Sequence, residues 1–244
     1  IENDGGGTNA GHVRVYQLNN SIWTQLGQDI DGVTHDQSGR SISLSADGSI
    51  LAIGSTENDV VPAGPGHVSI FNWDGASWVQ LGQDIIGEAA GDESGWAVSL
   101  SDDGNTLAIG APSNDVNGMT TDGGHVRLYS FDGNSWTQLG QDIDQINYNN
   151  QFGYSVSLSG NGDKVAIGAI KNDANGVDAG QVRVFSVLEG VQYTSPACSG
   201  CTDSLALNYD PYSLIDDGSC CYVGCTDSTS SNYNPSACID DGSC

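Results

Sequence analysis

Along most of the chain, apolar and polar residues alternate in short runs with a period of two. Trp96, Val98 and Leu100, for example, alternate with small residues, which is the pattern of a strand with one face against a core. In the middle of the chain the pattern predicts four strands joined by turns, at 96–101, 106–110, 125–129 and 135–139. The turns contain Asp-Gly and Gly-Asn pairs, which suit hairpins. No segment keeps a period of 3.6, so we predict an all-β protein.

This four-strand pattern repeats along the chain. Gly-His-Val begins at residues 11, 66 and 124 and Gly-Gln-Val at 180, so successive copies are 55, 58 and 56 residues apart. The same period separates the copies of Gln-Leu-Gly-Gln-Asp-Ile, at 25–30, 80–85 and 138–143, and of Ala-Ile-Gly, at 52–54, 108–110 and 166–168. Four antiparallel strands with this period are typical of a β-propeller blade. One sheet cannot bury both of its faces, so the copies are expected to stack, with a linear solenoid as the alternative to a propeller.

The last copy resembles an FG-GAP repeat, as found in the propellers of integrin α-subunits. Phe152-Gly153, Val165-Ala166-Ile167-Gly168 and the Gly180–Phe185 run carry this resemblance, and the "GAP" element is clearest at Gly110-Ala111-Pro112. The resemblance covers about residues 1–195 and implies an extracellular propeller used for adhesion or ligand binding. In this frame we expect a half-blade at 11–30 and blades at about 36–85, 92–143 and 150–195, the last of which ends with a strand at 191–194. Three and a half blades do not close a ring, so we expect either further blades before Ile1 or a second chain that completes the ring.

The cysteines are confined to the end of the chain. All seven lie between Cys198 and Cys244, which indicates a disulfide framework formed in an oxidising compartment. After a linker at 196–199, residues 200–220 and 224–244 are two copies of one motif that agree at 14 positions. They resemble the Cys-Thr-Asp, Asn-Tyr-Asn-Pro, Asp-Asp-Gly-Ser-Cys repeats of large secreted proteins and, more distantly, thrombospondin type 3 repeats, which bind calcium. Equivalent positions suggest the disulfides Cys201–Cys220 and Cys225–Cys244, with Cys198 and Cys221 as a further pair and Cys238 left over.

The charge of the chain is strongly acidic. There are 31 acidic and 6 basic residues, for a formal net charge of −25. A nucleic-acid partner is excluded, because binding to phosphates requires Lys and Arg. We also expect no insertion into a membrane, because no apolar run approaches the length of a membrane-spanning helix.

Calcium is the metal that the oxygen-rich composition favours. In the tail the candidate ligands are Asp203, Asp216, Asp217, Asp227, Asp240 and Asp241. In the propeller loops they are Asp115, Asn117, Asp122, Asp173, Asn175 and Asp178. For both sets the alternative is a purely structural role in turns. The calcium loop of the FG-GAP family is not carried over, because the corresponding turns here keep too few carboxylates.

Other candidates for chemistry are few. His12, His67 and His125 share one repeat position, and each is expected to make a local contact in its own blade. Trp23, Trp78 and Trp136 also share one position and are expected to contribute to blade packing. Trp73, Trp96 and Tyr148 break the repeat and are candidates for binding a sugar or a protein, and Asn19 carries the one glycosylation sequon. A zinc site at Cys198 and Cys201 is a further alternative, although no second Cys-x-x-Cys accompanies them.

No linear hydrolase motif occurs in the sequence. We therefore expect a non-catalytic extracellular protein with a structural or adhesive role, in which the propeller presents a binding surface and the Cys-rich repeats form a stalk. The alternatives are a glycan- or protein-binding accessory module of a larger secreted enzyme and a subunit of an extracellular filament. The expected partners are a surface glycan or protein, or further copies of the chain.

Overall fold

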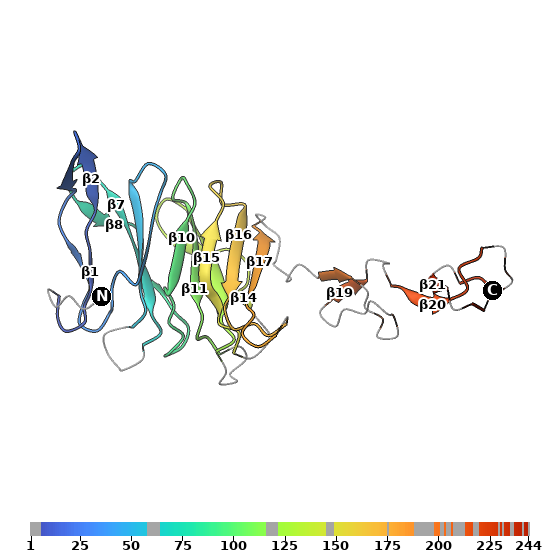
Figure 1. Cartoon of the computed structure of the whole chain (residues 1–244). Helices are drawn as coiled ribbons and strands as arrows, with labels where there is room; N and C mark the ends of the chain where they lie inside the picture. The colour runs from blue at the N-terminus through green and yellow to red at the C-terminus, as the bar shows by residue number, and fades with distance from the viewer. Residues whose placement is uncertain are drawn as a thin grey trace. The chain divides into compact units, whose positions relative to one another are not determined.

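The computed structural model divides the chain into two compact units, Ile1–Gln192 and Tyr193–Cys244. It describes residues 6–57, 64–115, 122–144, 149–174, 176–187, 198–200, 203, 206, 213–216, 220–228, 230, 232–234, 237–240 and 242–243. These residues form strands, turns and loops but no helix (Figure 1). The all-β prediction is confirmed. Since the described residues contain no helix, they contain none that could span a membrane.

The middle of the first unit consists of two similar five-stranded sheets (Figure 1). The first contains β5 (Ser41–Leu44), β6 (Ile50–Ser55), β7 (His67–Trp73) and β8 (Trp78–Gln80), with β9 (Ile85–Ile86) paired to β7. The second contains β10 (Ala97–Leu100), β11 (Thr106–Ala111), β12 (His125–Phe131) and β13 (Trp136–Gln138), with β14 (Ile143–Asp144) paired to β12. All these pairings are antiparallel. We call these sheets the second and third blades.

Smaller sheets flank these two blades in the sequence. The first blade contains the antiparallel pairs β1 (His12–Val13) with β4 (Ile30–Asp31) and β2 (Tyr16–Asn19) with β3 (Ile22–Gln25). The fourth blade contains β15 (Phe152–Leu158), β16 (Lys164–Ala169) and β17 (Gln181–Ser186), joined in that order. Residues 191–194, where we predicted one more strand, lie outside the described residues.

The hydrophobic core lies between neighbouring blades. Val68 and Ile70 of the second blade share one buried cluster with Leu107 and Ile109 of the third. Between the third and fourth blades the shared buried residues are Val126, Leu128, Phe152, Val165 and Ile167. Each fully buried side chain of this size contributes roughly 1.5–3 kcal/mol. The sheets therefore depend on one another for stability, as the repeats predict.

The repeated Gln-Leu-Gly-Gln motif joins one blade to the next. Gln83 Nε2 donates to the backbone carbonyl of Trp136 at 2.7 Å, and the indole Nε1 of Trp136 donates to Leu81 O at 3.0 Å. Gln28 and Trp78 form the same contact one blade earlier, at 2.9 Å. Trp78 and Trp136 are buried, as expected for blade packing, whereas Trp23 at the same repeat position is 66% exposed.

The first strands of successive blades also lie side by side. Contacts join β5 to β10 and β10 to β15. The Ser43 hydroxyl accepts a hydrogen bond from Leu100 N at 2.9 Å, and the Ser99 hydroxyl accepts one from Leu158 N at 2.9 Å. The alternation of Ser and apolar residues along these strands thus places one hydroxyl per blade against the backbone of the next blade.

The second unit contains two parallel strand pairs of matching register. The first pair is β18 (Cys198–Gly200) with β19 (Ser213–Asp216), and the second is β20 (Tyr222–Gly224) with β21 (Ala237–Asp240). Cys220, Cys221 and Cys225 are disulfide-bonded. Cys201 and Cys244 lie outside the described residues, so the predicted pairing stays a prediction, as do the predicted limits of the blades, linker and Cys-rich repeats.

Candidate metal centre

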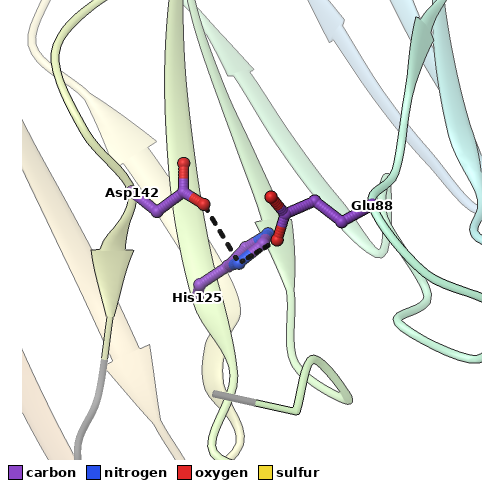
Figure 2. Close-up of side chains that lie close together, drawn as sticks. All are labelled: Glu88, His125 and Asp142. Atoms are coloured by element: carbon purple, nitrogen blue, oxygen red, sulfur yellow. Dashed lines mark ion pairs between the residues drawn. The ribbon is translucent and has the colours of Figure 1, made fainter. Parts of the chain in front are cut away.

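A buried histidine faces three carboxylates where the second and third blades meet. The His125 side chain, at the start of β12, is only 3% exposed. Its Nδ1 atom lies 3.8 Å from Glu88 Oε2, 3.9 Å from Asp142 Oδ2 and 4.0 Å from Asp144 Oδ1. All three distances are too long for a hydrogen bond. In Figure 2 the imidazole ring lies between the carboxylates of Glu88 and Asp142.

Strand register explains why these residues meet. In the antiparallel pair β12–β14, His125 is the partner of Asp144 and Val126 is the partner of Ile143. Side chains alternate between the two faces of a strand. Ile143 is buried in the core, so Asp142 and Asp144 point the other way, toward His125. Glu88 comes from the second blade, in the loop that follows β9.

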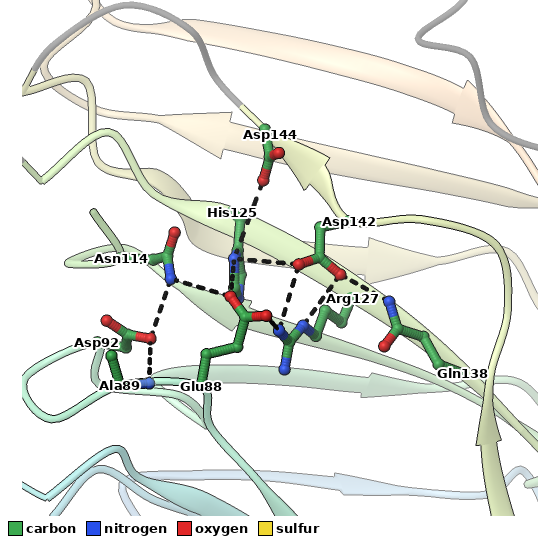
Figure 3. A network of polar contacts seen from close by, with 9 residues as sticks. All are labelled: Glu88, Ala89, Asp92, Asn114, His125, Arg127, Gln138, Asp142 and Asp144. Carbon is green, nitrogen blue, oxygen red and sulfur yellow. Dashed lines mark hydrogen bonds and ion pairs between the residues drawn. The ribbon is translucent and has the colours of Figure 1, made fainter. Parts of the chain in front are cut away.

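An arginine links the two blades at the same place. Arg127 lies two residues after His125 on β12 and donates to both carboxylate oxygens of Asp142, at 3.0 and 3.2 Å (Figure 3). It also forms an ion pair with Glu88. Gln138 donates a further hydrogen bond to Asp142 Oδ1 at 2.6 Å. The contacts of Arg127 with Glu88 and Asp142 hold the carboxylates that face His125.

The first blade contains most of this arrangement. Arg14 donates to Asp29 at 2.9 and 2.6 Å, and His12 is the strand partner of Asp31. The pair of Arg with Asp is therefore a repeated structural element. Within the described residues, Glu88, His125 and Asp142 form the one group of this kind that could hold a metal ion.

A second set of hydrogen bonds fixes the loop that carries Glu88. Asp92 Oδ2 accepts from Ala89 N and from Asn114 Nδ2, each at 2.9 Å. Asn114 also donates to Glu88 Oε2 at 3.5 Å. The side chain of Asn114 thus connects the loop of the second blade to the third blade (Figure 3).

The residues around His125 carry more negative than positive charge. Burial lowers the pKa of His125 to about 4, with a further contribution from the positive charge of Arg127, so the imidazole is neutral at pH 7. Burial raises the pKa of Asp144, and the negative charges of Asp142 and Glu88 raise it further. With ionised carboxylates, Glu88, Asp142 and Asp144 contribute −3 and Arg127 contributes +1, so the cluster has a net charge of −2.

These groups suit a divalent transition metal. One ligand atom each from Glu88, His125 and Asp142 lies within 4.8 Å of the others. A neutral imidazole with carboxylates is a ligand set typical of Zn²⁺ or Mn²⁺, whereas Ca²⁺ takes oxygen ligands. Sequence reasoning missed Glu88, Asp142, Asp144 and Arg127. The sequence feature that could have revealed them is the Asp-Ile-Asp run at 142–144. In a strand, its two Asp side chains lie on one face, which pairing with β12 places next to the repeated His.

The aromatic candidates have different environments. The ring of Trp73 packs against Trp78 with centroids 5.5 Å apart and belongs to the core between the first two blades. Trp96 is half-buried and packs against Tyr154. Tyr148 lies outside the described residues. Asn19 lies at the end of β2, where Asn20 and Ser21 form the hairpin turn.

The predicted calcium ligands are not brought together in the described residues. In the propeller, Asp173 Oδ1 accepts a hydrogen bond from Asp178 N at 2.7 Å, which is a local turn. Asp115 and Asp122 lie at the two ends of a segment whose interior is not described. In the second unit, Asp203 accepts from the Tyr222 hydroxyl at 2.5 Å, and Asp227 is exposed. Only the backbone of Asp216 and Asp240 is described, and Asn117, Asn175, Asp217 and Asp241 lie outside the described residues.

Comparison with known proteins bears out part of the resemblance. The profile of the FG-GAP repeat matches residues 146–185, the copy in which the sequence pattern is clearest. A search of the curated proteins finds no match. The resemblance of the Cys-rich copies to secreted repeats stays a prediction.

Solved structures similar to the chain include both enzymes and binding proteins. A 6-phosphogluconolactonase from Bacteroides uniformis is 14% identical with a TM-score of 0.48, over 72% of this chain and 44% of that one. A GH74 enzyme from Niastella koreensis is 18% identical with a TM-score of 0.37, over 68% and 26%. A chain of the nidogen–laminin complex is 8% identical with a TM-score of 0.41, over 72% and 55%. The chain thus spans between about a quarter and just over half of these proteins.

The prediction of a non-catalytic structural or adhesive protein is contradicted by the presence of a 6-phosphogluconolactonase and a GH74 enzyme among these structures. The same finding overturns the statement that the chain is not an enzyme. The likeness is one of fold and assigns no activity to this chain. The prediction relied on the regular repeats, the high negative charge and the absence of linear hydrolase motifs. In repeats of this kind, loops of different blades assemble a site, so such motifs are not required.

Proposed function

We propose that the first unit binds a divalent transition-metal ion between its second and third blades. The ligands are His125 Nδ1 and one carboxylate oxygen each from Glu88, Asp142 and Asp144. The observation that carries this proposal is the buried, neutral imidazole, whose Nδ1 lies 3.8–4.0 Å from three carboxylate oxygens without a hydrogen bond to any of them. Separations of this size leave room for an ion to draw the ligands inward.

Charge balance supports a divalent ion. The cluster's net charge of −2 equals the charge that such an ion neutralises. Burial raises the pKa of Asp144, and repulsion from the carboxylates of Asp142 and Glu88 raises it further. A bound ion would relieve this repulsion.

The site is open to solvent on one side, which would leave coordination positions of a bound ion accessible to water or substrate. The side chains of Glu88 and Asp144 are 48% and 44% exposed, whereas His125 is enclosed. An ion held from one side in this way retains water ligands. A metal ion can activate such a water molecule for hydrolysis, or it can bind a substrate oxygen that replaces the water.

The test is metal titration of the full chain by calorimetry, after removal of bound metal, with Zn²⁺, Mn²⁺ and Ca²⁺ as separate probes. We expect Zn²⁺ or Mn²⁺ to bind more tightly than Ca²⁺. The substitutions H125Q and E88Q should each weaken this binding about tenfold or more. The matched control is H67Q, because His67 has the same repeat position but Ser69 and Ile86 replace Arg127 and Asp144 there. Equal binding by wild type, H125Q and E88Q would overturn the proposal.

A further inference from the structure

Three unlike side chains occupy one repeat position in three consecutive blades. Arg40, Trp96 and Tyr154 each follow the glycine that precedes the first strand of their blade or lies at its start. Repeat positions inside the blades are mostly conservative, such as the Ala-Ile-Gly copies. Variation at an exposed position of a rigid scaffold is typical of a recognition surface.

The backbone holds these three side chains in equivalent places. Gly39, Gly95 and Gly153 have φ values of +87°, +90° and +88°, a region that favours glycine. The amide of each following residue donates to a carbonyl three residues back, at 3.2 Å for Arg40, 3.0 Å for Trp96 and 3.2 Å for Tyr154. The same tight turn is thus built three times, on strands that contact one another.

The side chains form a continuous row. The guanidinium carbon of Arg40 lies 3.6 Å from the centroid of the Trp96 ring. The rings of Trp96 and Tyr154 have centroids 5.3 Å apart and are tilted by 50°. All three side chains are half-buried, so each is fixed by its neighbours and keeps part of its surface in solvent.

The charge of Arg40 has a different environment from the charges of Arg14, Arg127 and Lys164. Arg14, Arg127 and Lys164 are paired with carboxylates. Arg40 forms no ion pair within the described residues, although the chain has 31 acidic side chains. A guanidinium that stacks on an aromatic ring keeps its in-plane N–H groups available for two parallel hydrogen bonds to a carboxylate.

We infer that the Arg40–Trp96–Tyr154 row binds a sugar ring that carries one carboxylate. The apolar face of the ring would lie on the aromatic side chains, and the carboxylate would accept hydrogen bonds from Arg40. Repulsion by the net charge of −25 is screened beyond about 8 Å at physiological salt. Because distant charges are screened, the nearby guanidinium of Arg40 would make the row prefer an acidic sugar over a neutral one.

The test is saturation-transfer NMR of the full chain with glucuronic acid and with glucose as the two probes. EDTA is present throughout, so that the outcome does not depend on the metal centre. Binding on the order of millimolar is expected for a single sugar ring. Glucuronic acid should bind about tenfold more tightly than glucose, and R40Q should remove this difference.

The matched control is R183Q, because Arg183 lies over the ring of Phe185 at 5.1 Å but outside the row. This substitution should leave glucuronic acid binding unchanged. Thermal unfolding of each variant identifies any loss of folding, and R40K, which keeps the charge but loses the planar pair of donors, should bind with intermediate affinity. Equal binding of the two sugars by wild type, or unchanged glucuronic acid binding by folded R40Q, would overturn the inference.

Discussion

The surroundings of His125 keep its imidazole neutral. Burial and the charge of Arg127 keep its pKa at about 4, against about 6.5 in an unfolded chain. Between these pH values the unfolded chain binds a proton that the folded chain does not. The contribution of the neutral His125 to stability is therefore complete above about pH 6.5 and is lost as the pH falls toward 4.

We expect H125Q to be less sensitive to acid than wild type. Gln occupies the same repeat position in the fourth blade, as Gln181. The cost of keeping His125 neutral at pH 4 corresponds to roughly 3 kcal/mol. Urea unfolding in EDTA at pH 4 to 8 measures the free energy of unfolding for both proteins. The explanation fails if the difference between the two proteins does not change between pH 6.5 and 4.

The residues of the proposed metal site also show which features cannot be recognised in a sequence. His125 was recognisable as a repeated position, but Glu88 is far from it in the sequence and lies on the preceding blade. Their approach depends on strand register and on the packing of one sheet against another. Trp96 was recognisable because it breaks the repeat, whereas its stacking between Arg40 and Tyr154 follows only from the matching turns of three blades.

At the scale of elements, the long strands follow from the pattern and the short ones do not. β6 and β11 are almost fully buried, as their continuous apolar sequences predict. The two-residue strands β4, β9 and β14 were missed, because two residues are too few to show a period. Yet β14 is the strand that brings Asp142 and Asp144 to His125.

The turns between first and second strands offer a matched test of blade stacking. Gly48 and Gly104 occupy the same turn in the second and third blades, with φ values of +73° and +71°. A Cβ added at Gly48 would meet no atom within 4 Å, whereas at Gly104 it would lie 2.6 Å from Ile50 Cδ1 and 3.0 Å from Ile50 Cβ. Ile50 belongs to the preceding blade.

We expect G48A to cost about 1 kcal/mol, which is the penalty for a side chain at positive φ. G104A should cost roughly 1–3 kcal/mol more, because Ile50 must also move. Urea unfolding measures both. Equal decreases in the free energy of unfolding would show that the second and third blades are not tightly packed against each other at this turn.

At the scale of the whole molecule, the two units depend on different sources of stability. The first unit buries large apolar side chains between its blades, and residues 1–197 contain no cysteine. The second unit is too small for a comparable core, and Cys220, Cys221 and Cys225 are disulfide-bonded there. We propose on this basis that the chain folds in an oxidising compartment.

Reduction should therefore unfold the second unit and spare the first. Removal of native disulfides from a small domain costs about 2–5 kcal/mol, whereas the first unit has no bond that a reductant can break. Scanning calorimetry of the full chain with and without a phosphine reductant should show an unchanged main transition, while amide exchange in the second unit becomes fast. Mass spectrometry of the non-reduced peptides should identify Cys201–Cys220 and Cys225–Cys244. A main transition that moves with the reductant would mean that the blades draw stability from the disulfide-bonded unit, and the two sources of stability would not be separate.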